Sequence, residues 1–214
     1  FAVPLLFLLL LAWGADFASF PIPFNLLSYA PFIGFFGFNF YSWLNAVDSP
    51  DFLNGLPVRV PQLLRAKIIV YFLMTTWISV LFLVIMAQLL NEWEALLAAL
   101  IVMIANSVYI VALSGLLMGL RPNKAIFDTQ IMAIFWVATV IPLVSLFLLS
   151  FTQGNIDLYE NWGAGIGDET ATEFTARADS YFESILAISF GLLALGGVFL
   201  LMLERRWGTA AFEN

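Results

Sequence analysis

The chain has 214 residues, of which 62% are hydrophobic and 11% are charged, and its net charge is -7. A soluble domain carries about 25% charged residues, so this composition excludes an ordinary soluble protein and indicates an integral membrane protein. The chain has no His and no Cys, which excludes a histidine base, a thiolate nucleophile, a His-ligated haem and the usual zinc sites. It also has no Walker-type loop. We therefore expect no enzymatic site, no metal site and no cofactor in the chain itself.

Long runs without Asp, Glu, Lys or Arg divide the chain into predicted membrane spans. They cover residues 17–47, 68–91, 95–120, 129–156 and 184–203, and each reaches the roughly 20 residues that cross the hydrocarbon. A shorter apolar run at residues 1–14 is interpreted as the end of a first spanning helix, in a chain whose N-terminal part is missing. The apolar part of a secretory signal is the alternative for this run. The predicted fold is all-α, a single domain over residues 1–214 with six transmembrane helices.

The second run contains several prolines and phenylalanines. Because proline breaks or kinks a helix, we expect Pro21 and Pro23 in an outer turn and the span itself from Asn25 to about Val47. The phenylalanines of this run surround the predicted helix. They indicate either contact with lipid or an aromatic wall facing a lipid-like substrate.

The basic residues predict the orientation, because Lys and Arg concentrate in cytoplasmic loops. With six spans, seven of the eight fall on one side: Arg59, Arg65, Lys67, Arg121, Lys124, Arg205 and Arg206. Only Arg177 falls on the other side, within an acidic outer loop at residues 152–183. That loop either keeps an exposed surface solvated or binds cations or a basic ligand. The chain is therefore predicted to be a multi-pass protein of the cytoplasmic (plasma) membrane.

The four later runs contain no charged residue, so an ion pump or proton-coupled carrier is less expected. Their neutral polar residues are the candidates for a translocation path: Thr75, Thr76, Ser79, Asn106, Ser107 and Ser114. The alternative for the same residues is hydrogen bonding between helices. The segment "GLLMG", Gly115 to Gly119, has the spacing of small residues that lets helix backbones approach closely.

A cytoplasmic loop at residues 48–67 separates the second and third predicted spans. It starts with a helix-start signal at residues 48–51, carries a short apolar stretch, breaks at Gly55 and Pro57, and resumes as a helix after Pro61. This pattern predicts a short helix at the cytoplasmic surface. Such a helix can lie in the lipid interface or dock in a groove of a partner.

The sequence "LNGLPVRVPQLLRAKIIVYFL" in this loop resembles the segment between the second and third helices of exporter-type ABC transporter permeases, the type-2 membrane domain. The resemblance extends to the six spans, the short outer turn "NEWE" and the inner loop "GLRPNKAIFD". It implies that the short helix is a coupling helix that contacts an ATP-binding subunit. Leu56, Pro57, Val58, Leu64, Ala66 and Lys67 match the pattern directly.

The resemblance implies a membrane-spanning permease subunit that moves substrate outward, while ATP is bound and hydrolysed on a partner. The implied partners are ATP-binding subunits, a second permease half and membrane lipid, with no nucleic acid. The candidate coupling residues are Phe52, Leu53, Leu56, Pro57, Val58, Arg59, Arg65 and Lys67. The alternative function is a non-catalytic assembly or structural subunit of a larger membrane complex.

Overall fold

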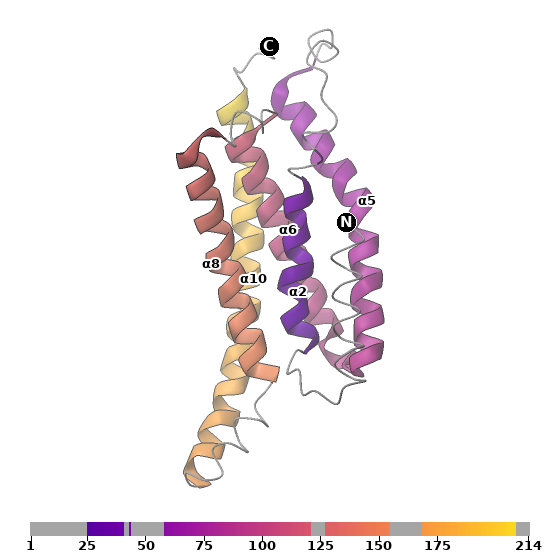
Figure 1. Ribbon diagram of the computed structural model, residues 1–214, viewed down its shortest axis with the longest axis vertical. Coiled ribbons are helices and arrows are strands. Elements are labelled where there is room, and N and C mark those ends of the chain that lie inside the picture. The colour runs from indigo at the N-terminus through magenta and orange to yellow at the C-terminus, as the bar shows by residue number, and fades with distance from the viewer. Residues whose placement is uncertain (1–24, 41–42, 44–57, 121–126, 155–167, 209–214) are drawn as a thin grey trace.

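The computed structural model describes residues 25–40, 43, 58–120, 127–154 and 168–208. Within these ranges the chain is all-helical and has no strand. The elements are α2 (Leu26–Phe35), η1 (Phe36–Phe38), α5 (Val60–Leu90), η2 (Trp93–Ala95), α6 (Leu96–Met118), α8 (Thr129–Gly154) and α10 (Asp168–Trp207). Figure 1 shows them as one elongated helical bundle.

Four helical segments are long and apolar enough to cross a membrane: Val60–Leu90, Trp93–Met118, Thr129–Gln153 and Tyr181–Trp207. They correspond to the last four predicted spans, and they make the chain a multi-pass membrane protein. The second predicted span starts where the prolines indicated, because Asn25 caps the N-terminus of α2, and it is described as a shorter apolar helix over Leu26–Phe38. The first predicted span and Pro21 and Pro23 lie outside the described residues.

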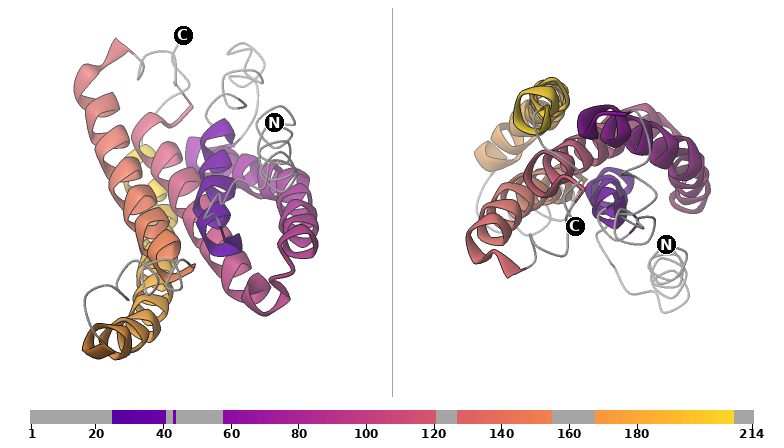
Figure 2. Two further views of the ribbon diagram at one scale, coloured as in Figure 1. Left: turned by 60° about the horizontal axis from the view of Figure 1, so that its bottom comes forward. Right: turned by 90° about the horizontal axis from the view of Figure 1, so that it is seen from above.

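Helix α6 is the centre of the bundle. It is the most buried of the four spans, with α2 packed on one side and α10 on the other, while α5 and α8 lie at the two flanks (Figures 1 and 2). A main core formed by side chains of α2, α5, α6, α8 and α10 holds these helices together. The fully buried Leu26, Leu83, Ile110, Leu146 and Ile185 belong to this core.

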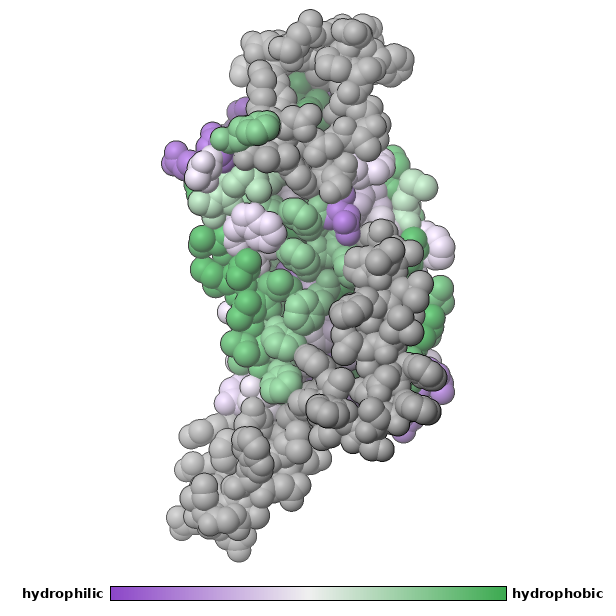
Figure 3. Space-filling view, in the orientation of Figure 1, coloured by the Kyte–Doolittle hydropathy of each residue, from purple (hydrophilic) through white to green (hydrophobic). Residues whose placement is uncertain are grey.

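The two ends of the bundle differ in charge. Arg177 lies in the first half of α10, whereas five basic residues lie near the start of α5 or the end of α10, namely Arg59, Arg65, Lys67, Arg205 and Arg206. We call this the basic end, at the top of Figure 1, and its opposite the far end. Figure 3 shows a band of apolar side chains between the two ends. These five basic residues therefore share one end of the bundle, and the assignment of that end to the cytoplasmic side stays a prediction.

Two helix boundaries differ from the sequence interpretation. Helix α5 begins at Val60, so residues 60–67 of the predicted cytoplasmic loop are helical and Pro61 does not precede the helix. Proline fits there because the first N–H groups of a helix have no intrahelical partner. Helix α10 begins at Asp168, so residues 168–183 of the predicted outer loop are helical as well.

Helix α10 is therefore much longer than a membrane span requires. Its 40 residues extend about 60 Å at 1.5 Å per residue, about twice the hydrocarbon thickness. Only Tyr181–Trp207 has the composition of a span. The preceding turns, residues 168–180, extend past the other helices at the far end (Figure 1).

Candidate functional site

The predicted coupling segment meets the described structure at the start of α5. Val58 is half-buried and Arg59 is exposed, directly before the first helical residue. The side-chain oxygen Oε1 of Gln62 accepts the Arg59 backbone N–H at 3.1 Å, which stabilises the helix start. Phe52, Leu53, Leu56 and Pro57 lie outside the described residues, and so does the predicted coupling helix.

The first turns of α5 belong to a small hydrophobic cluster that is separate from the main core. We call it the basic-end cluster; it consists of Phe40, Val60, Leu64, Ile68, Tyr71, Val111, Leu116 and Leu203. Leu64, which matches the permease pattern, is fully buried in it. The cluster brings four segments into contact: the residues that follow α2, the start of α5, and the parts of α6 and α10 at the basic end.

Polar contacts strengthen this junction. Arg65 of α5 forms an ion pair with Glu204 of α10, with 3.3 Å between Nη2 and Oε2. Both side chains are well exposed, so the pair contributes at most about 1 kcal/mol. Tyr71 donates its hydroxyl to the Phe36 carbonyl at 2.7 Å. Lys67, one turn before Tyr71, is also buried.

Trp207 closes the basic end of the bundle. Its Nε1 donates to the Gly115 carbonyl at 3.2 Å, and its ring lies against Gly119, which has φ +58° just after the end of α6. A Cβ on Gly119 would come within 2.6 Å of that ring, whereas a Cβ on Gly115 would meet Ile68 and Leu203 at ordinary distances of 3.6 and 3.7 Å. The close backbone approach predicted for the Gly115–Gly119 segment is therefore not made at Gly115, and at Gly119 the close neighbour is the tryptophan side chain of α10.

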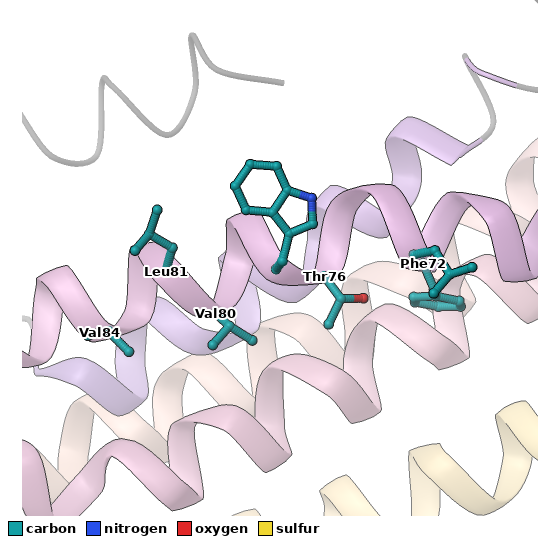
Figure 4. A pocket seen from close by; sticks show the side chains of 7 residues that line it. Phe72, Thr76, Val80, Leu81 and Val84 are labelled. Atoms are coloured by element: carbon teal, nitrogen blue, oxygen red, sulfur yellow. The ribbon is translucent and has the colours of Figure 1, made fainter.

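The predicted path residues of each helix lie close together on its surface, because Thr75, Thr76 and Ser79 of α5 fall within about 100° of helix rotation, and so do Asn106, Ser107 and Ser114 of α6. Ser79 is buried, while Thr75 donates to the Tyr71 carbonyl of its own helix at 2.8 Å. Thr76 lies in an apolar groove of about 760 Å³ along one side of α5, together with the half-buried Val80 and Val84 and the exposed Leu81 (Figure 4). The three α5 residues therefore lie on adjoining parts of the helix surface, with Ser79 buried and both threonines half-buried, and their role in a translocation path stays a prediction.

Of the α6 members of the set, Asn106 and Ser114 are buried and Ser107 is half-buried. Asn106 donates through Nδ2 to the Pro31 carbonyl of α2 at 2.8 Å, and Ser114 donates to Ile110 of its own helix at 2.7 Å. Ser107 lies against Gly37, whose Cβ would be 3.0 Å from the serine carbonyl. These contacts correspond to the packing alternative for the polar residues.

A polar cluster that the sequence did not predict lies at the far end of the bundle. The Glu92 carboxylate, in the turn between α5 and α6, accepts the Leu26 N–H at 2.6 Å. Asn25 donates through Nδ2 to the Ser150 carbonyl of α8 at 3.0 Å and accepts hydrogen bonds from the backbone N–H and the hydroxyl of Ser28. The cluster therefore ties the N-terminus of α2 to α5, α6 and α8.

Burial raises the pKa of Glu92, and the hydrogen bond from the Leu26 N–H acts in the opposite direction and is the smaller effect. The available sequence signal was "NEWE", an acidic turn that interrupts two apolar runs. It predicted the turn, but it did not reveal that the carboxylate turns back to cap another helix. Within the described ranges no three acidic side chains come together as a possible metal site.

Comparison of the chain with protein-family models, with curated proteins and with solved structures found no match.

Proposed function

We propose that this chain is the membrane-spanning permease subunit of an ATP-driven exporter of the ABC type. A separate nucleotide-binding subunit would hydrolyse ATP, and the segment before α5 would transmit its movement to the membrane helices. A second permease half would complete the translocation path, and no residue of this chain would carry out covalent chemistry. The proposal starts from the sequence pattern of residues 53–73.

One structural observation supports the proposal most directly. The predicted coupling segment continues without a linker into α5, because Val58 and Arg59 are followed at once by the helix. The first turns of that helix are packed in the basic-end cluster together with α6 and α10. A partner that displaces the segment would therefore act on a small hydrophobic junction, and the main core would not need to be disrupted.

The packing of α5 fits the role of a lever. Phe82, Leu83 and Met86 attach its far half to the main core, and its first turns are held by the basic-end cluster. Between these attachments one face of α5 is exposed, with Leu73 73% exposed and Trp77 61% exposed, while Ser79 on another face is buried. A long helix held at two points can tilt at one end while the other stays in place.

The second candidate function is a non-catalytic assembly subunit of a larger membrane complex. The observation that favours it is the extension of α10, where residues 168–180 continue as a helix past the apolar span. A rigid acidic helix outside the membrane would suit contact with a partner protein. The two functions predict different partners, an ATP-binding subunit at the basic end or a non-ATPase protein at the far end.

The experiment that tests the permease proposal changes the coupling segment. Leu56→Asp combined with Val58→Asp places two charges where an apolar contact with the ATP-binding subunit is proposed. An unpaired buried charge costs at least about 3 kcal/mol, so association should weaken at least about a hundredfold. Binding of the purified permease to its ATP-binding subunit and the coupled ATP turnover would both be measured.

The matched control is Asn54→Asp combined with Gln62→Glu. It adds the same two negative charges at polar positions of the same region, and the carboxylate introduced in place of Gln62 can still accept the Arg59 N–H. This control should insert into the membrane and bind its partner within a few-fold of the wild type. Equal binding and turnover in the Leu56/Val58 variant and its control would show that the segment is only an interfacial loop.

A further inference from the structure

The face of α10 that is turned away from the bundle forms a groove near the basic end. Its volume is about 450 Å³ and it is lined by Val198, Leu201, Met202, Glu204 and Arg205. Val198, Leu201, Met202 and Arg205 have the i, i+3, i+4, i+7 spacing of one helix face. The groove is therefore apolar toward the membrane centre and charged at the basic end, where Arg205 and Glu204 line it.

Two glycines extend this face toward the membrane centre. Gly197 precedes Leu201 by one turn, and Gly191 precedes Val198 by two turns. A Cβ on either glycine would meet no atom within 4 Å. Gly196 differs, because its Cβ would lie 3.2 Å from the backbone of Tyr109 on α6. The open glycines therefore leave room along the exposed face and have no role in the packing of the bundle.

The charge of Arg205 faces this groove without a described counter-ion. Glu204 already pairs with Arg65, and the guanidinium of Arg206 lies over the Trp207 ring at 5.6 Å. Among the described residues no ion pair is formed by Arg205, which is exposed. An anion with an apolar tail would satisfy both parts of the groove.

We propose that this groove binds an anionic phospholipid. The lipid phosphate contacts the Arg205 guanidinium, and an acyl chain lies along Leu201, Val198 and the open surface at Gly197. Arg is suited to this role because its planar guanidinium forms bidentate hydrogen bonds with phosphate. The length of the exposed face also suits a lipid. Gly191 lies about 20 Å from Arg205 along the helix axis, which is comparable to the length of an extended acyl chain.

A second copy of the chain is a poorer occupant of the same face. In a parallel pair related by a two-fold axis, the same surface of each copy meets the other. Two Arg205 side chains would then approach each other at the membrane boundary, and Glu204 is already engaged by Arg65. Like charges in contact are unfavourable, so charge complementarity favours the phospholipid.

The test measures lipid binding to the purified full chain in detergent by native mass spectrometry. The two probes are phosphatidylglycerol and phosphatidylcholine with identical acyl chains. Wild-type protein should bind at least one phosphatidylglycerol with at least about fivefold higher affinity than phosphatidylcholine. Arg205→Gln should lower phosphatidylglycerol affinity about tenfold or more, because a charge-assisted contact is lost. The matched control, Arg206→Gln, should lower it less than about threefold.

A second variant tests the apolar part of the groove. Gly197→Leu fills the open surface and should weaken binding of both lipids at least about fivefold with an unchanged or slightly higher melting temperature, since its Cβ meets nothing within 4 Å and glycine is a poor helix former. Its control, Ala133→Leu at an exposed position of α8, should leave lipid binding unchanged. Equal losses for Arg205→Gln and Arg206→Gln would overturn the site in favour of diffuse attraction to the basic end. Conversion of a dimer to a monomer by Gly197→Leu, with lipid binding unchanged, would assign the face to a second copy.

Discussion

Single glycines set how closely α2 approaches α6. A Cβ on Gly34 would lie 2.8 Å from the Met103 carbonyl oxygen and 2.9 Å from the Asn106 Cβ, inside contact distance. Asn106 also donates to the Pro31 carbonyl in the same contact. Small residues that allow close backbone approach, combined with a polar side chain that bonds across, are a common way to join helices in a membrane.

We expect Gly34→Ala to separate these helices and destabilise the protein by about 1 to 2 kcal/mol, since the added methyl group overpacks a tight contact. Thermal unfolding in detergent measures the change. Gly191→Ala is the matched control, because its Cβ meets open space, and it should leave stability unchanged or slightly higher. Equal melting temperatures for the two variants would mean that α2 and α6 are not in close contact.

Glu92 gives the far end a stability that depends on pH. Burial raises the pKa of its carboxyl, so the folded protein holds the proton more tightly than the unfolded chain does. Stability is then highest below the ordinary carboxyl pKa of about 4.3, falls as pH rises to the raised pKa, and stays lowered above it.

Glu92→Gln removes the charge and keeps an oxygen that can accept the Leu26 N–H. We therefore expect this variant to melt at a higher temperature than the wild type at about pH 7.5 and at the same temperature at about pH 4. Thermal unfolding in detergent at the two pH values checks this. A lower melting temperature of the variant at neutral pH would show instead that the carboxylate charge stabilises the N-terminus of α2.

At the scale of helices, the sequence predicted where the membrane spans lie along the chain, but it did not predict which faces of the helices contact one another. The four later spans could be found because crossing the hydrocarbon requires long uncharged runs, and the start of α2 could be found because Pro21 and Pro23 confine the helix to residues after them. The start of α10 was not predicted, because charged residues precede its apolar run. Charged residues limit the part of a helix that lies in the membrane, but the helix itself can continue beyond them.

The faces of the helices could not be predicted. Lipid-facing and protein-facing positions are both apolar in a membrane, so hydrophobicity has little periodicity to interpret. Thr76 and Asn106 are both neutral polar residues within apolar runs, yet Thr76 is half-buried in a groove along α5 and Asn106 is fully buried. The sequence also did not predict that Arg65 pairs with Glu204 of a distant helix, or that Gln62 accepts the backbone N–H of Arg59 three residues before it.

The extension of α10 provides a test of orientation. Thr170→Cys lies in the first turns of that helix, on the side that the basic residues predict to be outside. The chain has no other cysteine, so a membrane-impermeant maleimide should label this variant in intact cells. Asp128→Cys, exposed before α8 at the basic end, should be labelled only after permeabilisation. The reverse pattern would invert the topology.

At the scale of the whole molecule, the two hydrophobic clusters divide the bundle into unequal parts. The main core connects α2, α5, α6, α8 and α10, whereas the basic-end cluster holds the start of α5 against α6 and α10. A force applied before α5 therefore acts first on the smaller part. This division is the physical basis of the proposal that movement of a cytoplasmic ATPase enters the membrane helices through residues 48–67.

The most direct test of this proposal identifies what touches the coupling segment in the assembled complex. Val58→Cys would carry a photoactivatable benzophenone group, introduced through its thiol in inside-out vesicles, and Gln88→Cys, exposed near the far end of α5, would serve as the control position. We expect irradiation to cross-link position 58, and not position 88, to a subunit that binds and hydrolyses ATP. We also expect added nucleotide to change the yield of this cross-link. Cross-links from position 58 only to lipid or to other membrane subunits, with or without nucleotide, would contradict the proposal.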